Sequence, residues 1–467
     1  MSTDRRGGPN PVSYRAIFAL AWPASIAAAI TPALGAIDVW ALAQSDRPLD
    51  IAAIGLGSVI FSLVYWSFGF IRMSVAGLTA QAHGAADESE TRAALIRGAA
   101  LGGAIGAILA LLHWPIGALS FELLSIGSEA SNATMAAGRT YFDIRIWGAP
   151  FALATYAGFG WLTARGHTDY LMYASLIMTG LNIVLDYWFV VGLGWGAAGV
   201  AAGTLIAEIA GFFVTAIFVA VIMNEKGGLG AGWSRADLWR ADRIAHTLTI
   251  NRDIFIRTLI LAICFAWFTQ RGGAFGDTTL AANQVLLQLF LATGLALDGT
   301  AIAAETLVGQ SLGARDQSNG LQRYKTAVRR TFVVGGLASL AFVLIYLFGG
   351  PALVSMLTPD DEIRTRTLDY LPWVIISPLA VVFGFQLDGI FIGATRMREM
   401  RDSMIMSALI FLPLSLLLAS QFGNHGLWAA FNLYFLIRGL TLWRYLPRIR
   451  TSFEVEHNRS ASQTATT

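Results

Sequence analysis

The chain has 467 residues, of which 55% are hydrophobic and only 13% are charged, and its formal net charge is +2. A soluble domain carries about 25% charged residues, so this composition excludes an ordinary soluble protein and predicts a multi-pass membrane protein. The mild charge gives no sign of a nucleic-acid partner, and the single cysteine, Cys264, excludes a disulfide within the chain.

Twelve apolar segments follow one another along the chain and predict an all-α integral membrane fold with twelve transmembrane helices. Residues 1–15 precede them and are expected to form a cytoplasmic N-terminus, with no cleavable leader expected. The segments are 16–44, 51–82, 98–121, 144–164, 170–193, 197–223, 253–270, 280–308, 331–357, 370–394, 403–421 and 425–443.

The basic residues of the connecting loops predict the orientation in the membrane. If the N-terminus is cytoplasmic, twenty-three Lys and Arg residues fall on the inner side and five on the outer side. Cytoplasmic loops are enriched in Lys and Arg, so we expect both termini to be cytoplasmic.

The spans fall into two halves of six. The longest polar break, residues 224–252, is an expected cytoplasmic linker between an N-lobe at 16–223 and a C-lobe at 253–445, and residues 446–467 form a polar tail predicted to be disordered. Residues 79–89 resemble residues 308–318, with Gln81 matching Gln310 and Gly84 matching Gly313. Because six spans separate the repeats, both enter the membrane in the same sense, which predicts two pseudo-symmetric six-helix bundles.

Small residues recur at four-residue spacing on two of the segments. These runs are Gly98-x-x-x-Gly102-x-x-x-Gly106 and Gly199-x-x-x-Gly203. Small residues at this spacing let helices approach closely, so we expect them to lie at helix contacts.

Polar side chains from three spans of the first half lie at one predicted depth. Asp38, Asp186 and Thr204 are each some 10–12 Å inside the expected outer surface, from a rise of about 1.5 Å per residue, and Asn182 lies one turn below Asp186. Intramembrane acids are costly and therefore mark functional sites. No Lys or Arg is expected at that level, so these four residues predict a site for a coupling ion, either H⁺ or Na⁺. No other metal and no cofactor is expected.

The second half carries a different set of charges. Asp298 and Glu305 share a face of the eighth span, Asp388 lies on the tenth span, and Arg257 lies early in the seventh. Arg257 can satisfy Glu305 or Asp388, so this set is either a structural ion-pair network or a site that attracts a cationic substrate. Arg72 on the second span is an isolated intramembrane charge at a similar inner depth.

Enzyme motifs are absent from the sequence. The six histidines form no metal-ligand spacing, and the chain contains neither a G-x-x-x-x-G-K-[ST] loop nor a G-x-S-x-G elbow. A nucleotide-driven pump or a membrane hydrolase is therefore not expected, and transport has to use an ion gradient or be passive.

Several tracts taken together resemble the multidrug and toxic compound extrusion (MATE) family, over residues 15 to 445. The resemblance rests on Pro23 with Asp38, on Gly77-Leu-Thr-Ala-Gln81, on Leu181-Asn182 through Asp186, on Gly203-Thr204, and on Leu307-Val-Gly-Gln310. The tracts 251–257, 304–310 and 387–393 are similar to the DinF-like branch of that family.

The resemblance implies a V-shaped MATE-type fold that alternates between inward and outward openings and exports organic cations or other toxic compounds in exchange for H⁺ or Na⁺. Exchange of organic, mostly cationic, compounds for H⁺ is the leading hypothesis. The resemblance assigns Asp38, Asn182, Asp186 and Thr204 to the coupling ion, and matches Asp388 to an acid used by some members. Those members also carry a Glu in the seventh span, where this chain has Arg257, which favours coupling in the first half.

Three alternatives remain open at this stage: a Na⁺-coupled drug antiporter, a flippase for lipid-linked precursors, and a passive channel or scaffold. The expected setting is a bacterial inner membrane, with drugs or organic cations and the lipid bilayer as partners, and with the chain as a monomer.

Overall fold

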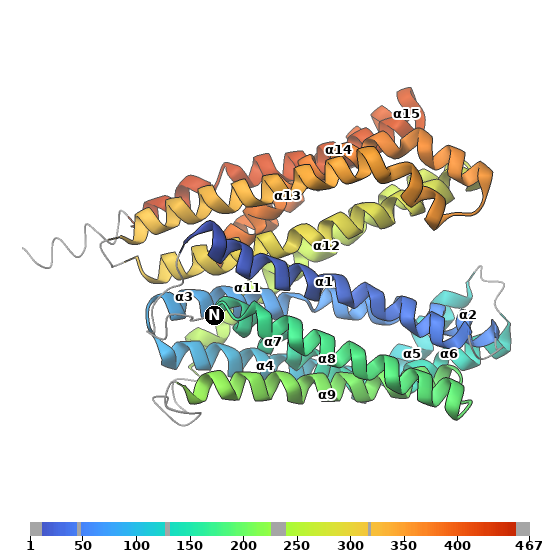
Figure 1. The fold of residues 1–467 in the computed structure, drawn as a ribbon, viewed down its shortest axis with the longest axis horizontal. Coiled ribbons are helices and arrows are strands. Elements are labelled where there is room, and N and C mark those ends of the chain that lie inside the picture. The colour runs from blue at the N-terminus through green and yellow to red at the C-terminus, as the bar shows by residue number, and fades with distance from the viewer. Residues whose placement is uncertain (1–11, 44–47, 127–130, 226–239, 316–318, 454–467) are drawn as a thin grey trace, which may run out of the picture. The chain divides into compact units, whose positions relative to one another are not determined.

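The computed structural model describes residues 12–43, 48–126, 131–225, 240–315 and 319–453. Every regular element in these ranges is helical (Figure 1). The chain forms two compact units, which we call the N-unit (Ile26–Thr79 and Glu88–Ala245) and the C-unit (Met1–Ser25, Ala80–Asp87 and His246–Thr467). Helices α1 (Tyr14–Ala43), α3 (Phe70–Gly84) and α11 (Ala241–Gly273) each contribute to both units.

The N-unit is a bundle of antiparallel helices in which α4 packs along α7, α8 along α9, and α2 along α6 (Figure 1). Besides its parts of α1, α3 and α11, its elements are α2 (Pro48–Ser67), α4 (Glu88–Leu111), α5 (His113–Ser125), α6 (Asn132–Arg145), η1 (Ile146–Gly148), α7 (Ala149–Ala164), α8 (Thr168–Tyr187), η2 (Trp188–Gly192) and α9 (Ala197–Asn224).

Glycines on α4 allow α7 to approach closely. A methyl group added at Gly102 would run into the carbonyl of Leu153, and one added at Gly106 would run into the backbone of Pro150. The prediction that this glycine run lies at a helix contact is therefore confirmed.

The helical segment that leads into α7 begins earlier than the sequence predicts. The apolar segment was placed at 144–164, but α6, η1 and α7 follow one another without a gap from Asn132 to Ala164. Ser131 caps the start, its hydroxyl accepting a hydrogen bond from the backbone N–H of Thr134 at 3.2 Å. The first turns of α6 are polar and lack an apolar pattern, so the sequence does not predict them as part of a membrane helix.

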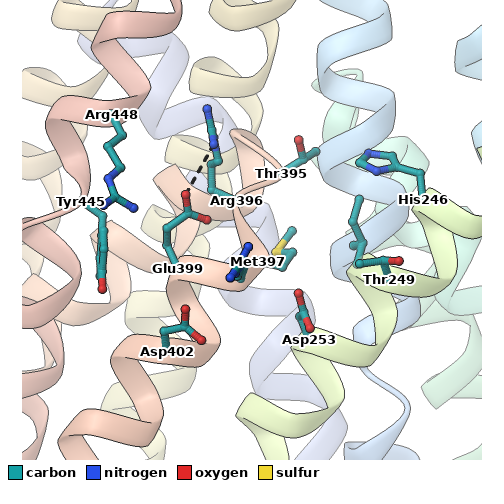
Figure 2. A pocket seen from close by; sticks show the side chains of 12 residues that line it. His246, Thr249, Asp253, Thr395, Arg396, Met397, Glu399, Asp402, Tyr445 and Arg448 are labelled. Atoms are coloured by element: carbon teal, nitrogen blue, oxygen red, sulfur yellow. Dashed lines mark hydrogen bonds and ion pairs between the residues drawn. The ribbon is translucent and has the colours of Figure 1, made fainter.

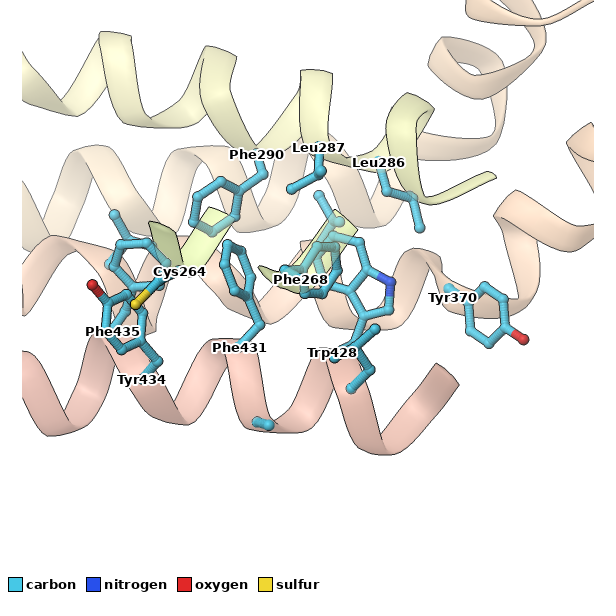
Figure 3. Packing of buried hydrophobic residues seen from close by; sticks show 14 of the residues in the cluster. Cys264, Phe268, Leu286, Leu287, Phe290, Tyr370, Trp428, Phe431, Tyr434 and Phe435 are labelled. Carbon is cyan, nitrogen blue, oxygen red and sulfur yellow. The ribbon is translucent and has the colours of Figure 1, made fainter. Parts of the chain in front are cut away.

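The C-unit is built on four long helices, with α14 packed against α12, α13 and α15. They are α12 (Asp277–Gly313), α13 (Gly320–Leu357), α14 (Asp361–Gly393) and α15 (Met397–Trp443). Gly423 has φ 58° and breaks α15 into two helices, which agrees with the predicted segments 403–421 and 425–443. Figure 3 shows aromatic side chains of α11, α12 and α15 interlocking in its core, among them Phe268, Phe290 and Phe431.

The two sequence repeats meet inside the C-unit in a symmetric way. A methyl group on Gly84 would overlap the carbonyl of Gln310, and a methyl group on Gly313 would overlap the carbonyl of Gln81. The sequence pairs Gln81 with Gln310 and Gly84 with Gly313, so exchanging the repeats exchanges these two contacts. This mutual contact is the geometric counterpart of the internal repeat.

By length and composition alone, seven helices of the described chain are able to cross a membrane. They are α4, α8 with η2, α9, α12, α13, α14 and α15 with its extension to Phe453. The predicted segments 16–44 and 51–82 correspond to α1 and to the pair α2 and α3, whose apolar stretches within the described residues are shorter.

Candidate functional site

Helices α8 and α9 carry the polar centre of the N-unit. Asn182 and Asp186 lie one turn apart on the buried face of α8, and Asp186 is fully buried. Thr204 lies on the buried face of α9, and the Asn182 side-chain Nδ2 donates a hydrogen bond to its hydroxyl at 3.2 Å. The predicted grouping of these three residues is therefore present in the structure.

Asp38 on α1 completes this group. It is buried, and its carboxyl group lies close enough to that of Asp186 for the two groups to interact electrostatically. Neither oxygen of Asp186, nor Oδ1 of Asp38, nor Oδ1 of Asn182 accepts a hydrogen bond from a donor in the described part of the chain. Buried polar atoms are nearly always hydrogen-bonded, so four acceptor oxygens left together fit a proton or a small cation.

A guanidinium group lies close to these acids, and the prediction that no Lys or Arg lies at this level is wrong. Arg145 on α6 acts electrostatically on both Asp38 and Asp186. It forms an ion pair with Glu208 of α9, with 3.5 Å between Nη2 and Oε1. Because α6 begins at Asn132, Arg145 lies thirteen residues into the helical segment rather than at its edge.

Sequence reasoning also missed the residues that hold Arg145. Its guanidinium donates a hydrogen bond to the Tyr141 hydroxyl and lies 4.6 Å from the centre of the Phe61 ring. The Tyr65 hydroxyl donates a hydrogen bond to Glu208 at 3.1 Å. Glu208 follows Thr204 by four residues, and this helical spacing could have indicated that the two side chains lie on the same face of α9.

Two backbone features fit closely around Asp186. Gly203 on α9 leaves the space that the carboxylate occupies, since a methyl group there would run into Oδ1 of Asp186. Directly after Tyr187 the α8 helix changes into the π-helical turn η2. Such turns are rare and occur often at functional sites.

The acid of the tenth predicted span has two cationic partners in the C-unit. Arg257 on α11 donates a hydrogen bond to Oδ2 of Asp388 at 2.7 Å, and Arg438 on α15 bonds to the same oxygen. The sequence predicted either Glu305 or Asp388 as the partner of Arg257, and in the structure the arginine bonds to Asp388. Arg438 was not among the residues that the sequence assigned to this network. The arrangement fits an ion-pair network, because two guanidinium groups share one carboxylate oxygen of Asp388.

The other predicted charges occupy separate surroundings. Asp298 on α12 is partly buried and acts electrostatically on Arg257, whereas Glu305 is 2% exposed on the same helix. Arg72 on α3 belongs to the N-unit, where its carbonyl packs against Gly160. The structure thus joins Asp298 to the Arg257 network, whereas Arg72 belongs to the other unit.

Comparison with known proteins now identifies the architecture. The MatE family model matches the chain twice, over residues 23–188 and 254–419. The chain belongs to the MATE family. As a MATE protein it is a multi-pass membrane transporter and not an enzyme, and the twofold match agrees with the repeat found in the sequence.

Two relatives and one solved structure illustrate the similarity. DNA damage-inducible protein F of Escherichia coli is 36% identical over 435 residues, covering 92% of each chain. A probable multidrug resistance protein NorM of Bacillus cereus is 24% identical over 434 residues, covering 88% of this chain and 90% of that protein. The crystal structure of MATE in the straight conformation superposes with a TM-score of 0.83 at 18% identity, covering 97% of this chain and all of that one. The predicted all-α MATE-type fold and the DinF-like resemblance are confirmed.

Proposed function

We propose that this MATE protein exports organic compounds in exchange for protons, with Asp38 and Asp186 as the proton site. The observation that supports it is that the two acids are buried close to one another, with three of their oxygens accepting no hydrogen bond from the described part of the chain. Two carboxylates side by side repel one another, whereas a carboxyl and a carboxylate share a proton in a hydrogen bond. Gain or loss of that proton changes the attraction between α1 and α8, the helices that carry the two acids.

Arg145 and Glu208 form an ion pair close to the two aspartates, and its charges act on the proton site. Glu208 lies within ion-pair distance of Arg145, so the guanidinium is held between that carboxylate and the aspartate pair. When the pair loses its proton, the attraction of Arg145 toward it increases. Proton release on the inner side and proton uptake on the outer side are then linked to movements of α1, α6 and α8, which alternating access requires.

Na⁺ is the rival coupling ion, because the same atoms are hard oxygen ligands. Oδ1 of Asn182, the free oxygens of both aspartates and the Thr204 hydroxyl form a set that suits a small cation. A proton shared by the two carboxyl groups and a Na⁺ bound between them would both bring the acids together, so the choice between the ions is made by the transport measurement below.

The substrates and setting follow from the family resemblance and remain part of the proposal. We expect organic cations as the main substrates and a monomer in a bacterial inner membrane with both termini cytoplasmic. Asp388 is not the anchor for the cationic group, because Arg257 and Arg438 already neutralise it.

The test uses purified protein in liposomes, with ethidium as the transported cation and an anionic dye for comparison. An imposed pH gradient is expected to drive ethidium export, whereas a Na⁺ gradient at constant pH is expected to have no effect. Asp38→Asn should abolish export, and Asp169→Asn, an exposed acid at the start of α8, should leave it unchanged. Full activity in Asp38→Asn would refute the proposed proton site, and export driven by Na⁺ alone would replace H⁺ with Na⁺.

A further inference from the structure

A polar cavity of about 560 Å³ opens in the C-unit (Figure 2). Its wall combines the beginning of α11, the turn between α14 and α15, and residues at the start and after the end of α15. No residue of the Asp388 network or of the proposed proton site lines it. The cavity therefore needs an explanation separate from proton coupling.

Each carboxylate in the cavity wall already has an arginine partner. Asp253 accepts hydrogen bonds from Arg401 at 2.8 Å and from Arg252 at 3.0 Å. Asp402 also bonds to Arg401, at 2.6 Å. Figure 2 marks the third pair, Glu399 with Arg396 at 3.4 Å. These acids are thus neutralised from within the protein and do not make the cavity a cation site.

Two arginines of the wall remain without a carboxylate. Within the part of the chain that the structure describes, neither Arg398 nor Arg448 forms an ion pair, and the Arg448 guanidinium lies 4.8 Å from the centre of the Tyr445 ring. His246 and Thr249 line the cavity beside them and provide groups able to donate hydrogen bonds. The cavity therefore has a surplus of positive charge and of donors.

The cavity lies where apolar helices reach the membrane surface. The helix Asp361–Gly393 and the following helix Met397–Phe453 are both candidate membrane spans, and Thr395 and Arg396 belong to the turn between them. A turn between two successive spans lies at the level of the lipid headgroups. Basic pockets at this level recognise anionic lipid headgroups.

We propose that this cavity binds a phosphate ester of net negative charge, with Arg398 and Arg448 holding its phosphate group. The planar guanidinium group donates two parallel hydrogen bonds to phosphate oxygens, the arrangement in which arginine is most selective. The volume falls in the range of about 300–1,000 Å³ that encloses a small organic molecule, so it accommodates a headgroup such as phosphoglycerol. The phosphate can come from an anionic phospholipid or from a soluble ester.

The test measures binding to the delipidated full-length protein by native mass spectrometry, with phosphatidylglycerol, phosphatidylcholine and glycerol phosphate as separate probes. The double variant Arg398→Gln/Arg448→Gln is expected to bind phosphatidylglycerol at least tenfold more weakly than the unchanged protein. The control, Arg329→Gln/Arg444→Gln, removes the same charge from exposed positions outside the cavity and is expected to bind within twofold of the unchanged protein.

The outcomes separate the sources of the phosphate and allow refutation. Binding of phosphatidylglycerol but not glycerol phosphate supports a lipid site, and binding of both supports a site for phosphate esters in general. Equal loss of binding in the pocket and control variants, or equal binding of phosphatidylcholine, would overturn the proposal. Because Arg398 and Arg448 are exposed, both variants should keep the melting temperature of the unchanged protein. The single variants Arg398→Lys and Arg448→Lys keep the charge but lose the paired hydrogen bonds, so they should bind more weakly than the unchanged protein and more tightly than the double glutamine variant.

Discussion

Gly203→Ala tests whether the position of Asp186 determines transport. The added methyl group would overlap Oδ1 of Asp186 and lie 3.3 Å from both its Cγ and its backbone nitrogen. The substitution gains about 0.5–1 kcal/mol in helix propensity, while overpacking costs about 1–3 kcal/mol. The protein should therefore lose about 0–2.5 kcal/mol of stability, which leaves it folded, while the carboxyl group moves away from Asp38.

Proton-driven ethidium export in liposomes measures the consequence. A displacement of about 1 Å at a reacting group can cost about 100-fold in rate, so export by Gly203→Ala should fall at least about tenfold. Gly180→Ala is the matched control on α8, because no atom lies within 4 Å of the added methyl group. It should transport normally and gain about 0.5–1 kcal/mol of stability. Normal export by Gly203→Ala would show that the position of the Asp186 carboxyl group is not critical for coupling.

Three further substitutions have distinct expected outcomes. Arg145→Gln leaves Glu208 buried without its ion-pair partner and should cost about 3–5 kcal/mol in detergent unfolding, whereas the added change Glu208→Gln should restore part of that loss. Gly313→Ala places a methyl group against the backbone of Gln81 and should cost about 1–3 kcal/mol; an unchanged melting temperature would contradict the tight contact between the repeats. His167 lies between α7 and α8, and burial lowers its pKa from the usual value of 6.5. Protonation therefore favours the unfolded chain, so stability should fall as the pH drops below that value. Melting temperature measured against pH checks this, and His167→Gln should remove this part of the acid sensitivity.

The sequence predicted the fold well because membrane helices have a strong local signal. Apolar runs, the charge of the loops and the repeat each reflect one constraint, that the backbone must be hydrogen-bonded within the bilayer. The break at Gly423 was also predictable, since apolar segments end on either side of it. The beginning of α6 was not predictable, because its polar first turns look like a loop and only their packing makes them part of the helix.

The candidate site was predictable only in part. Asp38, Asn182, Asp186 and Thr204 were found because isolated polar groups stand out in apolar segments. The neighbourhood of Arg145 was missed because depth estimated along one helix does not show which side chains reach across from another. A long side chain places its charge several ångströms from its backbone, so the structure was required to show which acids it meets.

The charges of the two units point to different roles. In the N-unit, three buried carboxyl groups share one guanidinium, so the group as a whole retains capacity for added positive charge. In the C-unit, Asp388 already binds two guanidinium groups, so another cation gains little there and must displace an existing ion pair. Within the described residues, Asp186 has two oxygens that accept no hydrogen bond, whereas Oδ2 of Asp388 accepts from two guanidinium groups. The proposed coupling in the N-unit therefore rests on Arg257 and Arg438 as much as on Asp38 and Asp186.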